Sequence, residues 1–183
     1  MIIVHGAGSF GHIIAKKYLL KKNNFLNFYK IHSSILKLNK IIIDIFQEKN
    51  INAIGISPLL ISVTKEGRIE SLYTKTIEKM LLKKIIPVLH GDVCFDKNNN
   101  ISIISGDQIV SYLSRKLNIQ KIGFGCDTDG VLDINKKTIP IITPHNINKF
   151  SNVIRSANCI DVTGGMKEKI HELMKLLNNN TTK

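Results

Sequence analysis

The stretch Met1-Ile-Ile-Val-His-Gly-Ala-Gly-Ser-Phe-Gly-His12 decides the fold of this chain of 183 residues. Residues 2–4 are apolar and predict a short buried strand, three glycines follow within six positions, and apolar residues at helical spacing occupy residues 13–19. Glycines between a strand and a helix let the backbone approach an anion, and the N–H groups that open the helix point at it. The stretch therefore predicts a phosphate-binding loop, with His12 in the first helical turn able to reach the same phosphate.

A dinucleotide site and a purely structural turn are weaker interpretations of these glycines. Residues 6–11 formally match the G-x-G-x-x-G fingerprint of dinucleotide-binding proteins, which needs an acidic residue about 20 positions later to hold the ribose. The first acidic residue of the chain is Asp44, and residues 16–40 contain seven lysines. A purely structural glycine turn is disfavoured by the histidines that flank the loop, His5 and His12. The phosphate-binding interpretation is therefore preferred.

The composition excludes several classes of function. Hydrophobic residues make up 43% and charged residues 22%, as in an ordinary globular protein. No apolar run approaches the ~20 residues of a membrane span. The net charge is +12, but only three of the 26 basic residues are arginine, and no basic run carries the interleaved aromatic residues of a nucleic-acid-binding protein. We expect neither nucleic acid nor a membrane as partner.

The start of the chain and its cysteines predict a cytoplasmic protein. Residues 1–12 run directly into the strand and the glycine loop and do not resemble a signal or transit peptide. Cys94, Cys126 and Cys159 are odd in number and far apart, and they form no C-x-x-C pair. Reduced thiols are therefore expected, rather than disulfides or a zinc site.

Short apolar runs alternate with longer helical patterns, which predicts one α/β domain over residues 1–183. The expected helices are residues 31–49, 72–84, 105–117 and 166–177, and the expected strands are residues 2–4, 52–57, 85–90, 101–104 and 122–125, with a hairpin at 60–70. Such alternation implies a mostly parallel sheet covered by helices on both faces. Ligands of these sheets bind at the carboxyl ends of the strands.

Polar, glycine-marked motifs follow several of these strands. They are His90-Gly-Asp92, Ser105-Gly-Asp107, Asp127-Thr-Asp-Gly130 and Thr163-Gly-Gly165. Several helix starts at one sheet edge could hold several phosphates, and Ser105 or Asp107 can cap its helix. Lys169, one turn inside the last helix, could reach a nucleotide phosphate or could equally be a solvated lysine. His90 is equally compatible with a core histidine, and the aspartates of residues 127–130 with a capped turn.

The order of these motifs resembles that of the amino acid kinase family. The matching stretches are His5-Gly-Ala-Gly-Ser-Phe-Gly-His12, Pro87-Val-Leu-His-Gly-Asp92, Ser105-Gly-Asp107, Asp127-Thr-Asp-Gly-Val131 and Asp161-Val-Thr-Gly-Gly-Met-Lys-Glu-Lys169. The histidine that closes the first motif is similar to that of the family branch acting on isopentenyl phosphate and of related fosfomycin-type kinases. The resemblance implies a three-layer αβα sandwich, with residues 1–118 as the acceptor-phosphate lobe and 119–183 as part of the nucleotide lobe.

The resemblance also implies an activity, the ATP-dependent phosphorylation of isopentenyl phosphate to isopentenyl diphosphate in isoprenoid biosynthesis, with Mg²⁺ bridging the ATP phosphates and a homodimeric assembly. His12 would be catalytic, binding the acceptor phosphate and stabilising the transferring charge. The remaining implied roles are acceptor-phosphate binding by Gly6, Gly11 and Gly106, and ATP binding by Ala7, Asp127, Gly165 and Lys169. Phosphoryl transfer needs aligned phosphates and neutralised charge more than covalent chemistry, which agrees with these assignments. The alternatives are another small-molecule phosphate or phosphonate kinase of the family and a non-catalytic phosphate-binding protein.

The chain departs from the family pattern at both ends. Family members begin with another strand and a Lys-x-Gly-Gly-Ser turn and continue past the last helix, whereas this sequence contains no Lys-x-Gly-Gly and ends with the polar residues 178–183. We therefore expect a sheet that is incomplete at both ends. Because the loss of a transition-state cation costs orders of magnitude in rate, residues 1–183 alone are expected to turn over slowly or not at all.

Overall fold

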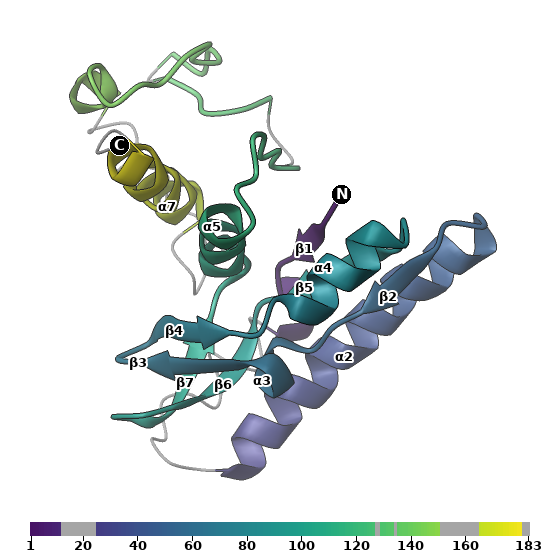
Figure 1. Ribbon diagram of the computed structural model, residues 1–183. Coiled ribbons are helices and arrows are strands. Elements are labelled where there is room, and N and C mark those ends of the chain that lie inside the picture. Colours follow the sequence, from purple (N-terminus) through teal and green to yellow (C-terminus); the bar gives the residue numbers. More distant parts are fainter. Residues whose placement is uncertain (12–24, 127–128, 134, 151–164, 181–183) are drawn as a thin grey trace. The chain divides into compact units, whose positions relative to one another are not determined.

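A computed structural model describes residues 1–11, 25–126, 129–133, 135–150 and 165–180. The strands, in chain order, are β1 (Ile3–His5), β2 (Ala53–Gly55), β3 (Ser62–Lys65), β4 (Arg68–Leu72), β5 (Ile86–His90), β6 (Asp92–Asp96) and β7 (Asn100–Ile104). The helices are α2 (Phe25–Glu48), α3 (Pro58–Ile61), α4 (Lys75–Leu82), α5 (Gly106–Lys116), α7 (Gly165–Asn180) and a 3-10 helix at Ile147–Phe150 (Figure 1). The chain divides into two compact units, Met1–Lys116 and Leu117–Lys183.

The first unit contains two sheets of different character. The strands β1, β5 and β2 form a parallel sheet in that order, with His5 opposite His90 and Gly55 opposite Val88. The second sheet has the order β4-β3-β6-β7, and only its β3–β6 pairing is parallel. The α/β class is confirmed. The expected parallel arrangement holds for the first sheet, whereas the second is mainly antiparallel because β3–β4 and β6–β7 are hairpins.

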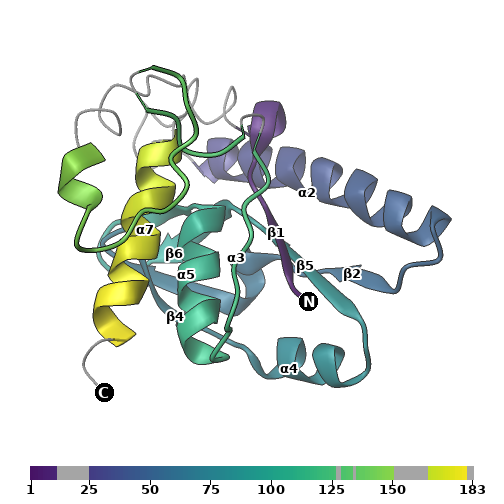
Figure 2. The ribbon, with the colours of Figure 1, turned by 90° about the horizontal axis from the view of Figure 1, so that it is seen from above.

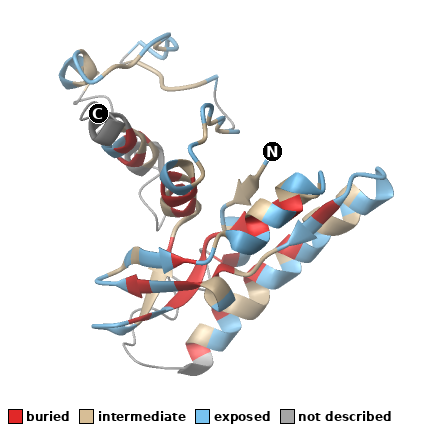
Figure 3. Ribbon diagram, viewed as in Figure 1, coloured by how far each residue is buried: buried red, intermediate tan, exposed pale blue. Residues whose placement is uncertain are grey.

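Helices cover both faces of the parallel sheet. Figure 2 shows α2 on one side of β1, β5 and β2, and α4 on the other. The core lies between these layers and includes Val88 and Leu89 of β5, which are completely buried (Figure 3). On α2, Ile31 and Ile35 pack against Val93 of β6. The three- and four-residue spacing of apolar residues that predicts this helix therefore marks the face that it buries.

Two segments differ from the sequence-based expectation. Residues 92–96 form the strand β6, which pairs with β7, whereas the sequence predicts no strand over these residues. The apolar run between the aspartates at the two ends of this strand is only three residues long, so the sequence does not indicate a strand there. Residues 122–125, expected as a strand, have no regular structure, and no described strand pairs with them. A short apolar run has no reason to stay extended when no neighbouring strand forms hydrogen bonds with its backbone amides.

Within the described part of the chain, every helix is too short or too polar to cross a bilayer.

Asp96 ties the two hairpins of the second sheet together. Its Oδ2 accepts a hydrogen bond of 2.8 Å from the N–H of Gly67, and its Oδ1 accepts one of 3.3 Å from the N–H of Glu66. These two residues form the β3–β4 turn, and their positive φ angles of 53° and 74° suit a two-residue hairpin. From the β6–β7 turn, Oδ1 accepts the N–H groups of Asn98 and Asn99 at 3.0 and 2.9 Å.

Burial opposes ionisation of Asp96, but the surrounding N–H donors outweigh it and hold the pKa of this carboxyl well below its usual range. We predict that Asp96→Ala lowers the free energy of unfolding at pH 7 by about 2 kcal/mol, because charge-assisted hydrogen bonds are lost. A depressed carboxyl pKa stabilises the fold above the unfolded value of 3.8 and ceases to do so as the pH falls through the folded value. Urea unfolding should therefore show a difference between wild type and variant that shrinks below about pH 4.

The control is Asp44→Ala, because Asp44 is half-exposed on α2 and pairs with Lys40 one helical turn away. That variant should lose less than about 1 kcal/mol. Equal losses for the two variants would contradict the role given to Asp96.

Candidate functional site

Three glycine-bearing segments meet at the carboxyl ends of β1 and β5. The N–H of Gly91 donates to the carbonyl of His5 at 3.0 Å. A Cβ on Gly91 would lie 3.1 Å from the backbone nitrogen of Gly106, and a Cβ on Gly106 would lie 3.3 Å from the carbonyl oxygen of His5. The loop after β1, the turn after β5 and the start of α5 are therefore in direct backbone contact, which requires residues without side chains.

The loop after β1 rests on α2. Residues 8–11 are helical, and Ser34 of α2 donates from its hydroxyl to the carbonyl of Phe10 at 2.6 Å. A Cβ on Gly11 would collide with Ala7 and would lie 3.3 Å from Ile35, so this glycine is needed for packing. A Cβ on Gly6 would meet no atom within 4 Å. Of the two glycines of this loop that were predicted to line a phosphate, Gly6 is thus the one that borders open space.

The start of α5 is capped beside this loop. The hydroxyl of Ser105 accepts a hydrogen bond of 3.2 Å from the N–H of Gln108, which confirms one of the two capping residues expected from the sequence. The helix begins at Gly106, in contact with β1. Free N–H groups and the helix dipole make such a terminus attractive to an anion. The loop and the helix start together can therefore present N–H groups to one phosphate.

Three imidazoles and one carboxylate, of which His90 and Asp92 are buried and His5 and His32 half-buried, lie next to the glycine turn. His32 of α2 places its Nδ1 at 2.9 and 3.1 Å from the two carboxylate oxygens of Asp92. The Nδ1 of His90 is 3.6 Å from the same carboxylate, and its ring centre is 5.5 Å from that of His5. The N–H of Val93 donates to Asp92 at 2.8 Å. These polar side chains thus connect α2 with the ends of β1 and β5.

The hydrogen bonds of His5 assign its tautomer. Its Nδ1–H donates to the carbonyl of Gly6 at 2.8 Å, and its Nε2 accepts from the side-chain amide of Asn39 at 3.1 Å. Burial lowers the pKa of His5, although the Gly6 carbonyl acts in the opposite direction. A Cβ on Gly55 of β2 would collide with the Asn39 amide. Asn39 therefore holds the neutral form of His5, and the absence of a side chain on Gly55 of β2 leaves room for the Asn39 amide.

Burial shifts two further pKa values in opposite directions. It lowers the pKa of His90 to about 4, although the Gly91 carbonyl favours the charged form. It raises the pKa of Asp92 to about 6, against the stabilising effects of His32 and of the Val93 N–H. The Nε2 atom of His90 is buried and has no hydrogen-bond partner among the described residues. From the sequence, His90 could have been a core histidine with hydrogen bonds to both ring nitrogens. In the described part of the structure only Nδ1 has a partner, the carbonyl of Gly91 at 3.2 Å.

The residues singled out from the sequence fall into three groups. Those in the first unit, beside the glycine contact, are Gly6, Ala7, Gly11 and Gly106. Those on α7 in the second unit are Gly165, its first residue, and Lys169, whose Nζ lies 5.6 Å from the ring centre of Phe124. Those outside the described residues are His12 and Asp127. Which of them share one site stays a prediction, as does the assignment of the two units to acceptor and nucleotide.

The roles of His32, of Asp92 as its partner and of Asn39 were not predictable from the sequence pattern. His32 and Asp92 are 60 positions apart, and Asn39 and His5 are 34 positions apart, so no local pattern links them. A weak signal does exist, since His32 and Asn39 interrupt the predicted buried face of α2 with polar side chains. Groups of three or more histidine, cysteine or acidic residues that could hold a metal ion are absent from the described part of the chain.

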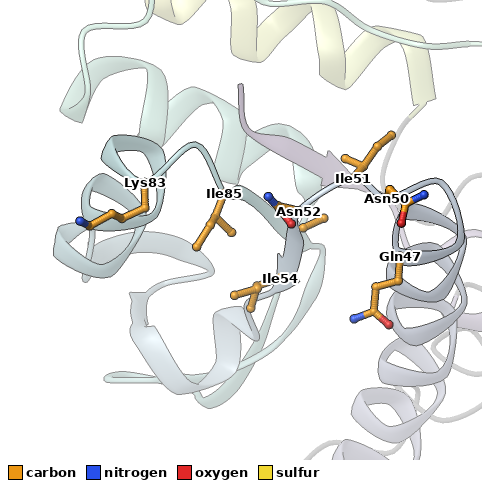
Figure 4. A pocket seen from close by; sticks show the side chains of 8 residues that line it. Gln47, Asn50, Ile51, Asn52, Ile54, Lys83 and Ile85 are labelled. Carbon is orange, nitrogen blue, oxygen red and sulfur yellow. The ribbon is translucent and has the colours of Figure 1, made fainter.

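An open hollow of about 600 Å³ lies at the opposite end of the parallel sheet. Figure 4 shows Ile54, Ile85 and Lys83 around it, near the starts of β2 and β5. Ligands of parallel sheets bind at the carboxyl ends of the strands, where the glycine contact lies. The hollow is therefore not the candidate site.

Comparison with known proteins identifies relatives over nearly the whole chain. The sequence pattern of the amino acid kinase family matches residues 1–183. An isopentenyl phosphate kinase of Methanocaldococcus jannaschii is 42% identical, with 96% of this chain and 69% of the relative aligned. The isopentenyl phosphate kinase of Methanothermobacter thermautotrophicus is 32% identical, with 96% and 71% aligned. A crystal structure of an isopentenyl phosphate kinase superposes with a TM-score of 0.77 at 31% identity, covering 98% of this chain and 71% of the other.

The lowered pKa of His90 predicts a pH-dependent stability. The neutral form is favoured in the fold, so this contribution is complete above pH 6.5 and is lost as the pH falls toward the folded value of about 4. His90→Gln removes the titration. The free energy of unfolding of wild type should therefore fall relative to that of the variant, by up to about 1.4 kcal/mol for each pH unit in this interval.

Urea unfolding at several pH values between 7 and 4.5 measures this difference. His145→Gln, at an exposed position with no assigned role, is the control and should leave the difference from wild type constant. A constant difference for His90→Gln as well would show that His90 takes up a proton as easily in the folded as in the unfolded chain.

Proposed function

The chain belongs to the amino acid kinase family, and from this premise we propose that it phosphorylates isopentenyl phosphate to isopentenyl diphosphate with ATP, a step of isoprenoid biosynthesis. The relatives that match most of the chain at 42% and 32% identity carry that activity in their names. The observation in the fold that supports the proposal is the contact of three glycine segments at the carboxyl ends of β1 and β5. A small phosphate is the kind of ligand that such backbone accepts.

On the acceptor side, we propose that Gly6, Gly11 and Gly106 border the phosphate of isopentenyl phosphate. The open space at Gly6 and the capped start of α5 at Gly106 support this assignment. Gly11 would contribute by letting the helical turn 8–11 pack on Ile35, so that the turn stays beside the phosphate. His12 follows this turn directly and would supply the positive charge. A phosphate beside an imidazole favours its charged form.

On the nucleotide side, we propose that Ala7, Asp127, Gly165 and Lys169 bind ATP. Lys169 lies one helical turn after Gly165, the first residue of α7, and its Nζ approaches an aromatic ring at 5.6 Å. A helix start followed by a lysine combines N–H donors with a cation, which suits a nucleotide phosphate. Ala7 belongs to the first unit and the other three residues to the second, and the assignment rests on the family motif and on α7 itself.

The proposed reaction asks little covalent chemistry of the protein. Its residues would hold two phosphate groups in line and neutralise the charge that develops during transfer. Mg²⁺, which commonly keeps several waters and binds through substrate phosphates, would accompany ATP and help to neutralise the charge of its phosphates. We further propose a homodimer acting in the cytoplasm. Exposed apolar residues of α2, such as Ile41 and Ile45, support a partner surface, and the thiol of Cys94, which forms no disulfide, supports a reducing compartment.

We predict that His12→Ala, made in a version of the chain extended at its N-terminus by the family's Lys-x-Gly-Gly segment, lowers kcat for ATP-dependent phosphorylation of isopentenyl phosphate by about 10²–10³-fold, because a group that stabilises the transferring charge is removed. Product formation is followed by conversion of labelled isopentenyl phosphate to the diphosphate. His145→Ala, which removes a histidine with no assigned role, should retain wild-type turnover.

Full activity of His12→Ala across pH 6–8 would contradict the role of His12. No transfer to isopentenyl phosphate by the wild-type chain, with transfer to another phosphate or phosphonate, would favour a different acceptor within the same family. Phosphate binding without any transfer would favour a non-catalytic protein.

We predict that Lys169→Ala weakens ATP binding by about tenfold or more and leaves isopentenyl phosphate binding within about twofold, because one charge-assisted contact to a nucleotide phosphate is lost. Titration calorimetry with each ligand measures both. The matched control is Lys175→Ala on the same helix, where the lysine lies 3.4 Å from Glu172. Equal losses for the two ligands, or equal losses for the two variants, would remove Lys169 from the nucleotide site.

A further inference from the structure

Asp92 lies where four parts of the first unit meet. Its carboxylate accepts the Nδ1–H of His32 from α2 and the backbone N–H of Leu59 from α3. It also accepts the N–H of Val93 in its own strand and lies 3.6 Å from His90 at the end of β5. The residue itself is 1% exposed. A single side chain thus connects two helices with the turn between β5 and β6.

A buried carboxylate is an expensive way to join these elements. Desolvating it costs several kcal/mol unless donors compensate, and well-packed apolar side chains often stabilise a core equally well or better. Stability alone therefore gives a poor reason for this arrangement. Polar groups of fixed geometry do provide something that apolar packing does not, namely a single position for the segments that they join.

The segment that Asp92 fixes is the one that borders the candidate site. Gly91 precedes Asp92 directly, donates to the carbonyl of His5 at 3.0 Å, and comes within contact distance of Gly106. Any shift of Asp92 along the strand would therefore move the turn against the loop after β1 or against the start of α5. Displacements of about 1 Å at a reacting phosphate are enough to cost up to 10²-fold in rate.

We propose that Asp92 and His32 are positioning residues of the acceptor site, which brace the turn at Gly91 between the phosphate-binding loop and the start of α5. We call the pair of His32 and Asp92 the brace. Its assignment to the isopentenyl phosphate side of the site rests on the proposed function. It is separate from His12, Lys169 and the other residues given a ligand contact above. Its effect reaches the acceptor through the backbone of Gly6, Gly91 and Gly106.

The geometry selects the substitutions that test this brace. His32 uses Nδ1 and no other atom toward Asp92, and the side-chain amide of asparagine can place an N–H at nearly the same position. His32→Asn should therefore keep the brace, whereas His32→Ala removes its donor. Asp92→Asn replaces a carboxylate oxygen with an NH₂ group that cannot accept a hydrogen bond. Asp44→Asn, in the exposed Lys40–Asp44 pair of α2, is the matched control.

The first measurement needs no catalysis. The backbone amide signals of Gly6, Gly91 and Gly106 in ¹⁵N-correlated NMR spectra report the position of the three segments. We expect these signals to shift in His32→Ala and Asp92→Asn and to stay near their wild-type positions in His32→Asn and Asp44→Asn. Thermal unfolding of each variant verifies that it is folded. If Asp92→Asn does not fold, the comparison of His32→Ala with His32→Asn decides.

The second measurement separates acceptor from nucleotide. For His32→Ala we expect KM for isopentenyl phosphate to rise about tenfold, with KM for ATP within about twofold of wild type. His32→Asn should restore most of the loss. A residue that only stabilises the fold would instead lower the unfolding temperature and leave both KM values unchanged.

The outcomes distinguish the two proposals. Glycine signals that are unchanged in His32→Ala overturn the brace, whatever the activity of the wild-type chain. Shifted glycine signals together with equal changes in both KM values overturn its restriction to the acceptor side. A chain extended at its N-terminus by the family's Lys-x-Gly-Gly segment that still does not phosphorylate isopentenyl phosphate overturns the proposed function, and the glycine signals then decide the role of His32 and Asp92 alone, with inorganic phosphate as the added ligand.

Discussion

Close backbone packing at the ends of β1 and β5 is the constraint on which the first unit depends. Gly91 must approach Gly106, and Gly106 must approach the carbonyl of His5, at distances that leave no space for a side chain. These contacts place the start of α5 beside the loop that follows β1, and the hydroxyl of Ser34 on α2 donates to the carbonyl of Phe10 in the same loop. Both helices are thus attached to the loop that borders the candidate site.

Much of this arrangement could be predicted from local sequence. Apolar periodicity predicted α2, α4 and α5 and the strands β1, β2 and β5, because each element buries one face at a regular spacing. The hairpin around Gly67 was predictable for a similar reason, since its two-residue turn needs positive φ angles. The glycine motifs also marked the carboxyl ends of the parallel strands, so the edge of the sheet that carries the candidate site followed from the order of elements.

What the sequence could not provide are contacts that depend on the fold being complete. His32 pairs with Asp92 across 60 positions, and neither residue carries a signal of the other. Strand β6 was missed because an aspartate stands at each of its ends, and the reason for each lies elsewhere in the chain: Asp92 meets a helix, and Asp96 binds the turn of another hairpin. The strand expected at residues 122–125 fails for the converse reason. Its apolar residues fit a strand locally, but no described strand lies beside them.

The hydrogen bond from His5 to the Gly6 carbonyl has a consequence for the peptide plane that follows. In a trans peptide the carbonyl and the next N–H point in opposite directions. With the oxygen of Gly6 turned toward the imidazole, the N–H of Ala7 is turned away from it. The tautomer of His5 thus fixes the orientation of the Gly6–Ala7 peptide, and the side-chain amide of Asn39 fixes that tautomer. A side chain on the middle of α2 thereby sets the polarity of a loop more than thirty positions earlier in the chain.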